Sequence, residues 1–444
     1  MYFYLFLLAI SATLNWAGLT EKPDFLIHDI WVKIGRAQPA EDIAIVGIDS
    51  RSLQETGRWP WSREIQARLV ESITDAGAQS IVFDILLTEP DRDSVADDLQ
   101  LAGAISRHGQ VVLPILTGEY SAGKRNPEAL PIAEMTLAVA GLGHVFMPVD
   151  PDGIVRRVNL KSGFKSAHWS TLSLALAELL EQAPDPLPGA LRDARPQIYA
   201  WVSDHEVFIP FYGQGGTFTT YSASQVLSGA VGPDALAGKH VFVGVTAVGL
   251  GDILPTPVSN NAHPMSGVEV HATLFAALRD GRLVSAAHPY TGIVVIAVSL
   301  VLLLFFLVRS SPGLSLSASF VFALVPVVVS FVLYSQYRLW YPPLSAALPL
   351  LLSFPIWSWN RLEFVSRFIE GEINEADTEF EPVTTSQSLS LTNYLDTAMS
   401  HLPISGWRYV SNGQVFSNGQ VNCSDFTGSP ERGWTVRGEC YYKA

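Results

Sequence analysis

Five carboxylates lie at or just beyond the ends of apolar stretches that are typical of β-strands: Asp49, Asp84, Glu89, Asp91 and Asp252. In an open α/β sheet, ligands bind at the carboxyl ends of the strands, so these side chains could share one pocket. Their oxygens could hold a divalent cation, or act on a phosphate ester through a bound metal. The alternative is structural, because a strand-end aspartate often accepts N–H bonds from its loop and caps the next helix. We favour capping for Asp49 and Asp84, and the metal question stays open.

A second candidate site is the segment that contains Arg58, Trp59 and Trp61, where a guanidinium lies beside two large rings. Such a group can bind an anion or a stacked ligand. It can equally form a rigid lid that packs over the following helix, and the sequence leaves both interpretations open. Thr246 belongs to a glycine-rich turn, where close backbone packing is the favoured role and anion binding the alternative. The predicted ligand-binding residues are therefore Asp49, Arg58, Trp59, Trp61, Asp84, Glu89, Thr246 and Asp252.

The sequence lacks the patterns of common enzyme sites. It contains no Ser/His/Asp constellation, no GxSxG and no phosphate-binding GxxxxGKS or GxxxxGKT. Glu269 and His271 differ by two positions and do not share a helix face, so we expect no metal pair there. We predict no catalytic residue and no cofactor.

Short β-type stretches alternate with helical patterns between residues 39 and 281. This alternation is typical of an α/β fold with a mixed, largely parallel sheet flanked by helices. The clearest predicted elements are strands at 43–48, 80–84 and 110–115 and helices at 63–76, 91–108 and 267–280. The Asp150–Gly153 turn predicts an antiparallel pair formed by the strands on its two sides.

The region from residue 290 to residue 359 has only two charged side chains, Arg309 and Arg338. This region contains three apolar runs, and each has about the 17–25 residues that an α-helix needs to cross roughly 30 Å of hydrocarbon. A soluble core of ordinary size would not bury all three runs. Residues 1–20 contain no charged side chain and indicate an anchor, with a cleaved signal peptide as the alternative. We predict an N-terminal transmembrane helix and a three-helix transmembrane bundle, with spans at 1–20, 290–308, 314–334 and 339–359.

Basic residues at the span ends predict the orientation. Arg309, Arg361 and Arg367 fall on one side of the membrane and Arg338 on the other, and the more basic side is the cytoplasmic one. This count places residues 24–285 outside the cytoplasm and the C-terminus inside.

Cysteine usage and charge narrow the class of protein further. Both cysteines, Cys423 and Cys440, follow the last predicted span, so a disulfide cannot hold the segment 24–285 together. The chain of 444 residues has a net charge of −14 and no basic run, which argues against a nucleic-acid partner.

Several motifs occur in a specific order along this segment. They are Arg58-Trp-Pro-Trp61, Phe83-Asp84 with Glu89-Pro90-Asp91, Asp150-Pro-Asp-Gly153 with Val155-Arg-Arg157, and Gly244-Val-Thr246 through Asp252 to Gly267-Val-Glu-Val-His271. By these motifs residues 24–283 resemble the type-2 CHASE domain, an extracytoplasmic sensor of bacterial histidine kinases, nucleotide cyclases and serine/threonine kinases. The resemblance implies a sensory role, one span before the domain and three after it, and a homodimer. It transfers no binding residue, because the ligands of the family are largely undefined.

The segments after the last span fit such a receptor. Residues 360–376 carry apolar side chains at spacings of three and four and predict a cytoplasmic helical connector. Residues 390–444 predict a partial cytoplasmic module, PAS-like in its strand candidates. A phosphoacceptor-histidine segment and an ATP-binding glycine pattern are absent from the sequence, so the expected kinase output is not within these residues.

The leading hypothesis is a multi-pass receptor of the bacterial cytoplasmic membrane that senses an extracytoplasmic ligand of unknown identity and contacts membrane lipid. The alternative is a metal-dependent extracytoplasmic hydrolase that uses Asp49, Asp84 and Asp252. A transporter is disfavoured because the predicted spans carry almost no charge.

Overall fold

The computed structural model describes residues 2–38, 40–92, 94–117, 128–190, 201–247, 249–250, 253–260, 263–310 and 312–378, and six short strands after residue 407. The chain divides into two compact units, Met1–Leu352 and Ser353–Ala444. Each unit is described by itself.

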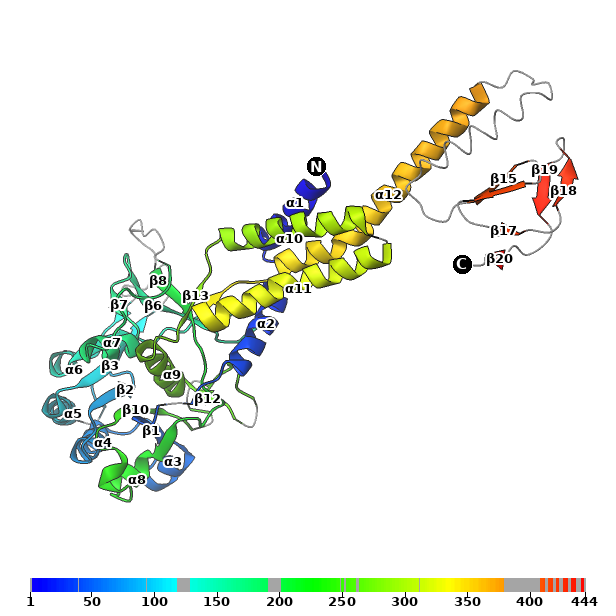
Figure 1. Cartoon of the computed structure of the whole chain (residues 1–444). Helices are drawn as coiled ribbons and strands as arrows, with labels where there is room; N and C mark the ends of the chain where they lie inside the picture. Colours follow the sequence, from blue (N-terminus) through cyan, green and yellow to red (C-terminus); the bar gives the residue numbers. More distant parts are fainter. Residues whose placement is uncertain are drawn as a thin grey trace. The chain divides into compact units, whose positions relative to one another are not determined.

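The main sheet of the first unit is largely parallel, with the strand order β4-β3-β2-β10-β1-β9 and with β5 paired to β3. Figure 1 labels the central strands β3, β2, β10 and β1 of this sheet. Only the β3–β4 pair is antiparallel. The strands are β1 (Ile43–Ile48), β2 (Ser80–Asp84), β3 (Val111–Thr117), β4 (Glu128–Ala129), β5 (Gly141–His144), β9 (Thr219–Ser222) and β10 (His240–Val245). The prediction of a mixed, largely parallel sheet flanked by helices is confirmed.

Helices cover both faces of this sheet, because side chains along a strand point alternately to opposite faces. In β1, Ile43 and Ile45 pack into the core that contains α7 (Leu172–Leu179) and α9 (Gly267–Arg279). Ala44 and Val46 pack into the other core. The helices on that second side are α3 (Ser50–Thr56), α4 (Arg63–Asp75), α5 (Val95–His108), α6 (Ala133–Ala138) and α8 (Ala223–Leu227).

A second sheet has the order β14-β13-β8-β6-β7. Its strands are β6 (Arg157–Phe164), β7 (Trp169–Ser170), β8 (Trp201–Phe208), β13 (Val284–Ala286) and β14 (Leu339–Trp340). The predicted hairpin around Asp150–Gly153 is wrong, because β5 joins the main sheet while β6 pairs with β8. β5 is held there by close packing, since a Cβ on Gly143 would lie 2.5 Å from Leu172 Cα at the start of α7. A short ribbon of β11 (Ile253–Leu254) and β12 (Met265–Ser266) completes the strands of this unit.

Five helices lie outside these layers. They are α1 (Tyr2–Trp16), α2 (Glu21–Ile34), α10 (Tyr290–Arg309), α11 (Pro312–Tyr337) and α12 (Leu344–Thr378). Among the residues that the structure describes, two segments are long and apolar enough to cross a membrane, Tyr290–Leu307 and Gly313–Tyr337, and Leu5–Trp16 is a shorter apolar helix. The spans at 1–20 and 339–359 therefore remain predictions.

The predicted start of the last span needs a correction. Leu339 and Trp340 form β14, which pairs in parallel with β13 in the register Ser285 to Leu339. The helix begins only at Leu344 and continues without a break to Thr378. The segment that enters the predicted last span is thus an edge strand of the second sheet.

In the second unit the structure describes three antiparallel strand pairs. They are β15 (Arg408–Ser411) with β16 (Gln414–Ser417), β17 (Val421–Asn422) with β20 (Tyr441–Tyr442), and β18 (Phe426–Ser429) with β19 (Gly433–Val436). The first part of the predicted PAS-like module, residues 390–407, lies outside the described residues.

Candidate ligand cleft and membrane junction

A cleft of about 880 Å³ opens at the carboxyl ends of the central strands. Its lining comes from the loops that follow β2, β5 and β10, from the segment before α4 and from the first turns of α9. This is the edge at which open α/β sheets bind ligands, and the volume suits a small organic molecule.

Four of the predicted ligand-binding residues line this cleft: Trp59, Trp61, Asp84 and Glu89. Trp61 is only 4% exposed, and its indole nitrogen donates to the carbonyl oxygen of Gly57 at 2.9 Å. The two tryptophan rings meet edge to face with centroids 5.7 Å apart. Trp61 is therefore a packing residue, as the lid interpretation predicts. The half-buried Trp59 exposes ring surface to the cleft.

The other four predicted residues do not join them. Asp49 caps α3, because its Oδ1 accepts from Ser52 N at 2.8 Å and from Ser222 Oγ at 2.8 Å. Burial alone would raise the pKa of Asp49, but these hydrogen bonds lower it. Arg58 is exposed and is not part of the cleft lining. Thr246 lines a separate cavity of about 220 Å³, and Asp252 lies outside the described residues.

The capping interpretation of Asp49 is thus confirmed, whereas Asp84 lines the cleft. Within the described ranges, the structure contains no group of three or more His, Cys, Asp or Glu side chains arranged to hold a metal. Glu269 lies apart from His271, because its carboxylate accepts from the backbone N–H groups of Gly216 and Thr217 at 2.9 and 3.0 Å.

Sequence reasoning missed His271 as a cleft residue. Its side chain lines the cleft from α9 although the residue is only 3% exposed, and its Nδ1 lies 3.4 Å from Ser173 Oγ. Burial lowers the pKa of His271 to about 4, so the ring is neutral at pH 7. Its position at the cleft follows from helix period alone, because Gly267, Val268 and His271 share one face at spacings of three and four.

Arg63 was also missed, and it fixes the shape of the cleft. Its Nε lies 3.3 Å from Asp98 Oδ1 on α5, and one terminal nitrogen donates to the carbonyl oxygen of Glu89 at 3.0 Å. The backbone N–H of Arg63 donates to Asp91 at 2.8 Å. These bonds tie the start of α4 to the loop after β2, so both walls of the cleft are held together.

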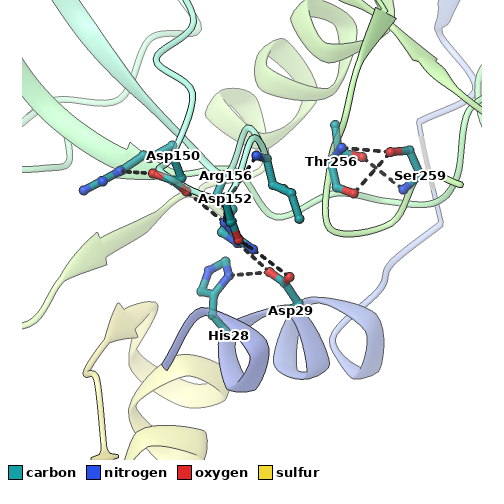
Figure 2. A network of polar contacts seen from close by, with 9 residues as sticks. His28, Asp29, Asp150, Asp152, Arg156, Thr256 and Ser259 are labelled. Atoms are coloured by element: carbon teal, nitrogen blue, oxygen red, sulfur yellow. Dashed lines mark hydrogen bonds and ion pairs between the residues drawn. The ribbon is translucent and has the colours of Figure 1, made fainter. Parts of the chain in front are cut away.

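A second polar cluster lies at the junction between the α/β layers and the apolar helices. Arg156 is fully buried and bonds to three aspartates (Figure 2). Its Nε and one terminal nitrogen contact Asp29 on α2 at 2.8 and 2.9 Å, and its terminal nitrogens contact Asp152 at 2.9 and 2.7 Å and Asp150 at 3.1 Å. Burial by itself would lower the pKa of Arg156, but the bonds to Asp29 and Asp152 outweigh burial and raise it.

Arg157, the next residue, contacts the same aspartate as Arg156, and its guanidinium lies 5.7 Å from the ring centroid of Phe25. It is partly exposed and bonds to Asp150 Oδ1 at 2.7 Å. Both arginines are therefore ion-paired. The guanidinium of Arg156 also lies 4.6 Å from the ring centroid of Phe25 on α2.

His28 extends this cluster to the apolar helices. The ring is fully buried, and its Nδ1 lies 3.5 Å from Asp29 Oδ1. It packs against Phe208 of β8 and Trp340 of β14, each with centroids 4.9 Å away, and against Tyr334 of α11 at 5.8 Å. Burial lowers the pKa of His28, so we expect a neutral ring. One side chain from α2 thus contacts β8 of the second sheet, the last turns of α11 and the strand β14 that follows α11.

Asp24 makes a separate contact from α2 to α12. Its Oδ1 accepts from the backbone N–H of Leu344 at 2.9 Å, so it satisfies a free donor at the first residue of that helix. The residue is 1% exposed, and burial raises the pKa of Asp24 to about 6.

Replacing Asp24 by asparagine should stabilise the protein at pH 7 and leave it unchanged at pH 4. The pKa of Asp24 in the folded protein, about 6, lies above the unfolded value of 3.8, so folding favours the protonated carboxyl. The stability that this protonated form contributes is fully present below pH 3.8. It is lost as the pH rises through 6, because Asp24 then ionises in the folded protein. The loss is on the order of 2–3 kcal/mol. Asparagine keeps the acceptor for Leu344 without the buried charge.

The thermal unfolding midpoint of the full chain in nanodiscs is measured for Asp24→Asn and for the unmodified protein at several pH values from 4 to 7. The quantity of interest is the difference between the two midpoints at each pH. The exposed Asp234→Asn is the matched control. A lower midpoint for Asp24→Asn than for the unmodified protein at pH 7 would show that the ionised form is the stabilising one.

Comparison with known proteins agrees with this architecture. A family model described as the CHASE2 domain matches residues 5–308, which is well over half of the 444-residue chain. Searches of curated proteins and of solved structures found no match. The matched residues include both walls of the cleft, α2 and the Arg156 cluster, and the chain belongs to the CHASE2 family of sensor domains.

Proposed function

We propose that this protein is a multi-pass receptor of the bacterial cytoplasmic membrane, with its CHASE2 domain outside the cytoplasm and its C-terminus inside. The family is a sensor family, and the two long apolar helices fit a membrane protein. The N-terminal helix α1 and the first part of α12 complete the predicted set of spans.

The stimulus in this proposal is a ligand that binds in the cleft. The cleft combines ring surface from Trp59, the carboxylates Asp84 and Glu89, and the buried ring of His271. Convergent polar groups beside aromatic ring surface in a cleft of this size are typical of a small-molecule site.

A short path connects the cleft to the junction. Leu254 lines the cleft, and the carbonyl oxygen of the next residue, Pro255, accepts from Val155 N at 2.8 Å. Val155 precedes Arg156, which contacts Asp29 on α2. A ligand that displaces Leu254 would therefore shift the strand that carries the buried guanidinium.

The observation that carries the proposal is the shared core at this junction. Phe25 and Val32 of α2 belong to the same buried cluster as Tyr334 of α11, Trp340 of β14 and Phe208 of β8. Close-packed interiors respond to displacement by moving between discrete arrangements. A movement of the second sheet would therefore move α2 and the starts of α11 and α12 with it.

The output of the receptor, in this proposal, is a cytoplasmic enzyme of the histidine kinase class in a homodimer. The unbroken helix from Leu344 to Thr378 supports a relay toward such an output, because it joins the predicted last span to the connector at 360–376. A continuous helix can carry a shift or rotation from its first turn to its last.

The relay is tested with the full chain in nanodiscs. A small-molecule library is screened by thermal shift, and hydrogen exchange is then measured in α2 and in residues 360–371 for each stabilising compound. We expect changed exchange in both segments for the unmodified protein and for the exposed control His168→Leu. The junction variant His28→Leu preserves an apolar side chain but removes the ring, and it should lose the change in 360–371 only.

A compound that stabilises the unmodified protein but not Trp59→Ala binds in the cleft. If such a compound leaves hydrogen exchange in α2 and in residues 360–371 unaltered, the receptor proposal is contradicted. It is also contradicted if His28→Leu relays the change as fully as the control.

A further inference from the structure

The helix α2 has an exposed apolar stripe, formed by Leu26, Ile30 and Ile34. These side chains recur every four residues and are 50–64% exposed. A spacing of four places side chains on one face of an α-helix. Large apolar side chains that are exposed together on one face are typical of a surface that another molecule covers.

The sensor domain occupies a different face of α2. Phe25 and Val32 belong to the buried core that also contains Phe208 of β8, and Asp29 bonds to Arg156 at 2.8 Å. At 3.6 residues per turn, the middle of the stripe lies roughly 130° around the helix axis from the middle of this face. The stripe therefore points away from the sensor domain.

A third face of α2 packs beside the place where α11 ends and α12 begins. The rings of Trp31 and Phe331 have centroids 4.9 Å apart, and His28 contacts Tyr334. Asp24 bonds to the first residue of α12. Asp24 and Trp31 are about 10 Å apart along the helix axis, yet both contact this same end of the apolar helices. α2 therefore lies across that end and does not simply continue away from it.

Exposed aromatic side chains lie at the ends of the apolar helices on this side. Trp16 is the last residue of α1, Tyr290 the first residue of α10 and Tyr337 the last residue of α11, and all three are 66–90% exposed. Tryptophan and tyrosine are enriched where a membrane meets water. In the proposed receptor these three rings mark the extracytoplasmic surface of the membrane, and α2 begins just after Trp16.

The charged side chains beside the stripe suit lipid headgroups. Lys22 and Lys33 are exposed and lie along one flank of the stripe by helix period. The other exposed charge on α2 is Glu21, which lies 3.6 Å from Arg157. Lysines beside an apolar face place their stems on apolar surface and their ammonium groups at lipid phosphates.

We propose that α2 is a membrane-surface helix, with its stripe at the extracytoplasmic boundary between headgroups and acyl chains and with Lys22 and Lys33 at lipid phosphates. This inference rests on the proposed receptor topology and names lipid as a partner of the helix that joins the sensor domain to the spans. Because α2 also carries Asp29, which bonds to Arg156, lipid bound to the stripe holds one side of the junction in place.

The test places a nitroxide at each stripe position of the full chain. The three stripe residues are replaced by cysteine one at a time, in a chain that carries Cys423→Ser and Cys440→Ser, and each labelled chain is reconstituted in nanodiscs of phosphatidylcholine and phosphatidylglycerol. Collisions of the nitroxide with oxygen, which concentrates in lipid, are compared with collisions with a water-soluble nickel chelate. We expect the oxygen-to-nickel ratio to be several-fold higher at the stripe than at Gln54→Cys, an exposed control on α3, because the acyl boundary excludes the chelate.

The role of the lysines is tested in the chain labelled at residue 30. Lys22→Gln combined with Lys33→Gln should lower the oxygen-to-nickel ratio by about twofold or more, because each lysine near an anionic surface adds to the attraction. The matched control is Lys165→Gln, an exposed lysine of the sensor domain, which should leave the ratio unchanged. An unchanged ratio in the double variant would overturn the assignment of the two lysines to lipid phosphates.

The proposal is overturned if the stripe positions give the same ratio as Gln54→Cys, because they then face water. It is also overturned if their spectra show spin–spin broadening that disappears on dilution with unlabelled chain, because a second copy then covers the stripe. Failure of the receptor function gives a different result. The stripe positions would remain in lipid, while a compound bound in the cleft would leave hydrogen exchange in residues 360–371 unaltered.

Discussion

Replacing Arg156 by leucine should lower the free energy of unfolding by about 3–5 kcal/mol, the usual cost of removing one partner from a buried ion-pair network. The substitution leaves the buried Asp29 without the guanidinium that lies at 2.8 Å, whereas Asp150 keeps Arg157 at 2.7 Å. It also removes the bond between α2 and the loop before β6. The measurement is thermal or denaturant unfolding of the full chain in detergent.

Two further variants make this prediction specific. Arg156→Lys keeps the charge but cannot reproduce the paired contacts at 2.8 and 2.9 Å to Asp29, so an intermediate loss is expected. Arg51→Leu breaks an exposed pair with Glu55 and should cost under about 1 kcal/mol. Equal midpoints for Arg156→Leu and Arg51→Leu would mean that the buried cluster does not hold the junction together.

Replacing Phe275 by alanine should cost about 3–5 kcal/mol, the range for truncating a fully buried phenylalanine. Phe275 lies on α9 with no exposed surface, and its ring packs 5.8 Å from Phe242 and 5.1 Å from His240 of β10. Because α9 also carries His271, loosening the helix should weaken any ligand bound in the cleft.

The matched control for Phe275→Ala is Leu137→Ala, since Leu137 is 88% exposed. It should change stability by less than about 0.5 kcal/mol. Unfolding is followed by circular dichroism. A loss below about 1 kcal/mol for Phe275→Ala would indicate that α9 is not packed on the sheet as described.

The layers of the sensor domain could be predicted from sequence because their elements are locally encoded. The predicted strands 43–48 and 80–84 coincide with β1 and β2, and the predicted helix 63–76 ends one residue beyond α4. These strands are buried along nearly their whole length, so their apolar runs are continuous and bounded by polar residues. Pairing was less predictable, as the wrong hairpin at Asp150–Gly153 shows, because it depends on partners distant in sequence.

The cleft could be predicted in part, because the carboxyl ends of parallel strands lie at the same edge of a sheet whatever conformation the connecting loops adopt. Asp84 and Glu89 reach that edge, and Trp59 and Trp61 come to it from the segment before α4. Asp49 caps α3 through the bond from Ser52 N, which the favoured interpretation of the sequence predicted, whereas its bond from Ser222, a partner 173 positions away, could not be predicted.

The junction could not be predicted from the sequence. Arg156 and Asp29 are 127 positions apart, and Asp24 and Leu344 are 320 apart, so no local pattern indicates either bond. The sequence of α2 mixes polar and apolar side chains, because this helix contacts both the Arg156 cluster and the aromatic side chains around His28.

In the proposed receptor, the CHASE2 domain and the connector after residue 359 lie on opposite sides of a membrane. Cysteine labelling tests it most directly, because the only natural cysteines are Cys423 and Cys440, which Cys423→Ser and Cys440→Ser remove. Gln54→Cys on α3 and Ser366→Cys on α12 then each introduce one thiol at an exposed position. A membrane-impermeant maleimide should label Gln54→Cys in intact spheroplasts and Ser366→Cys only after lysis. Labelling of both in intact spheroplasts, or of Ser366→Cys alone, would contradict the account.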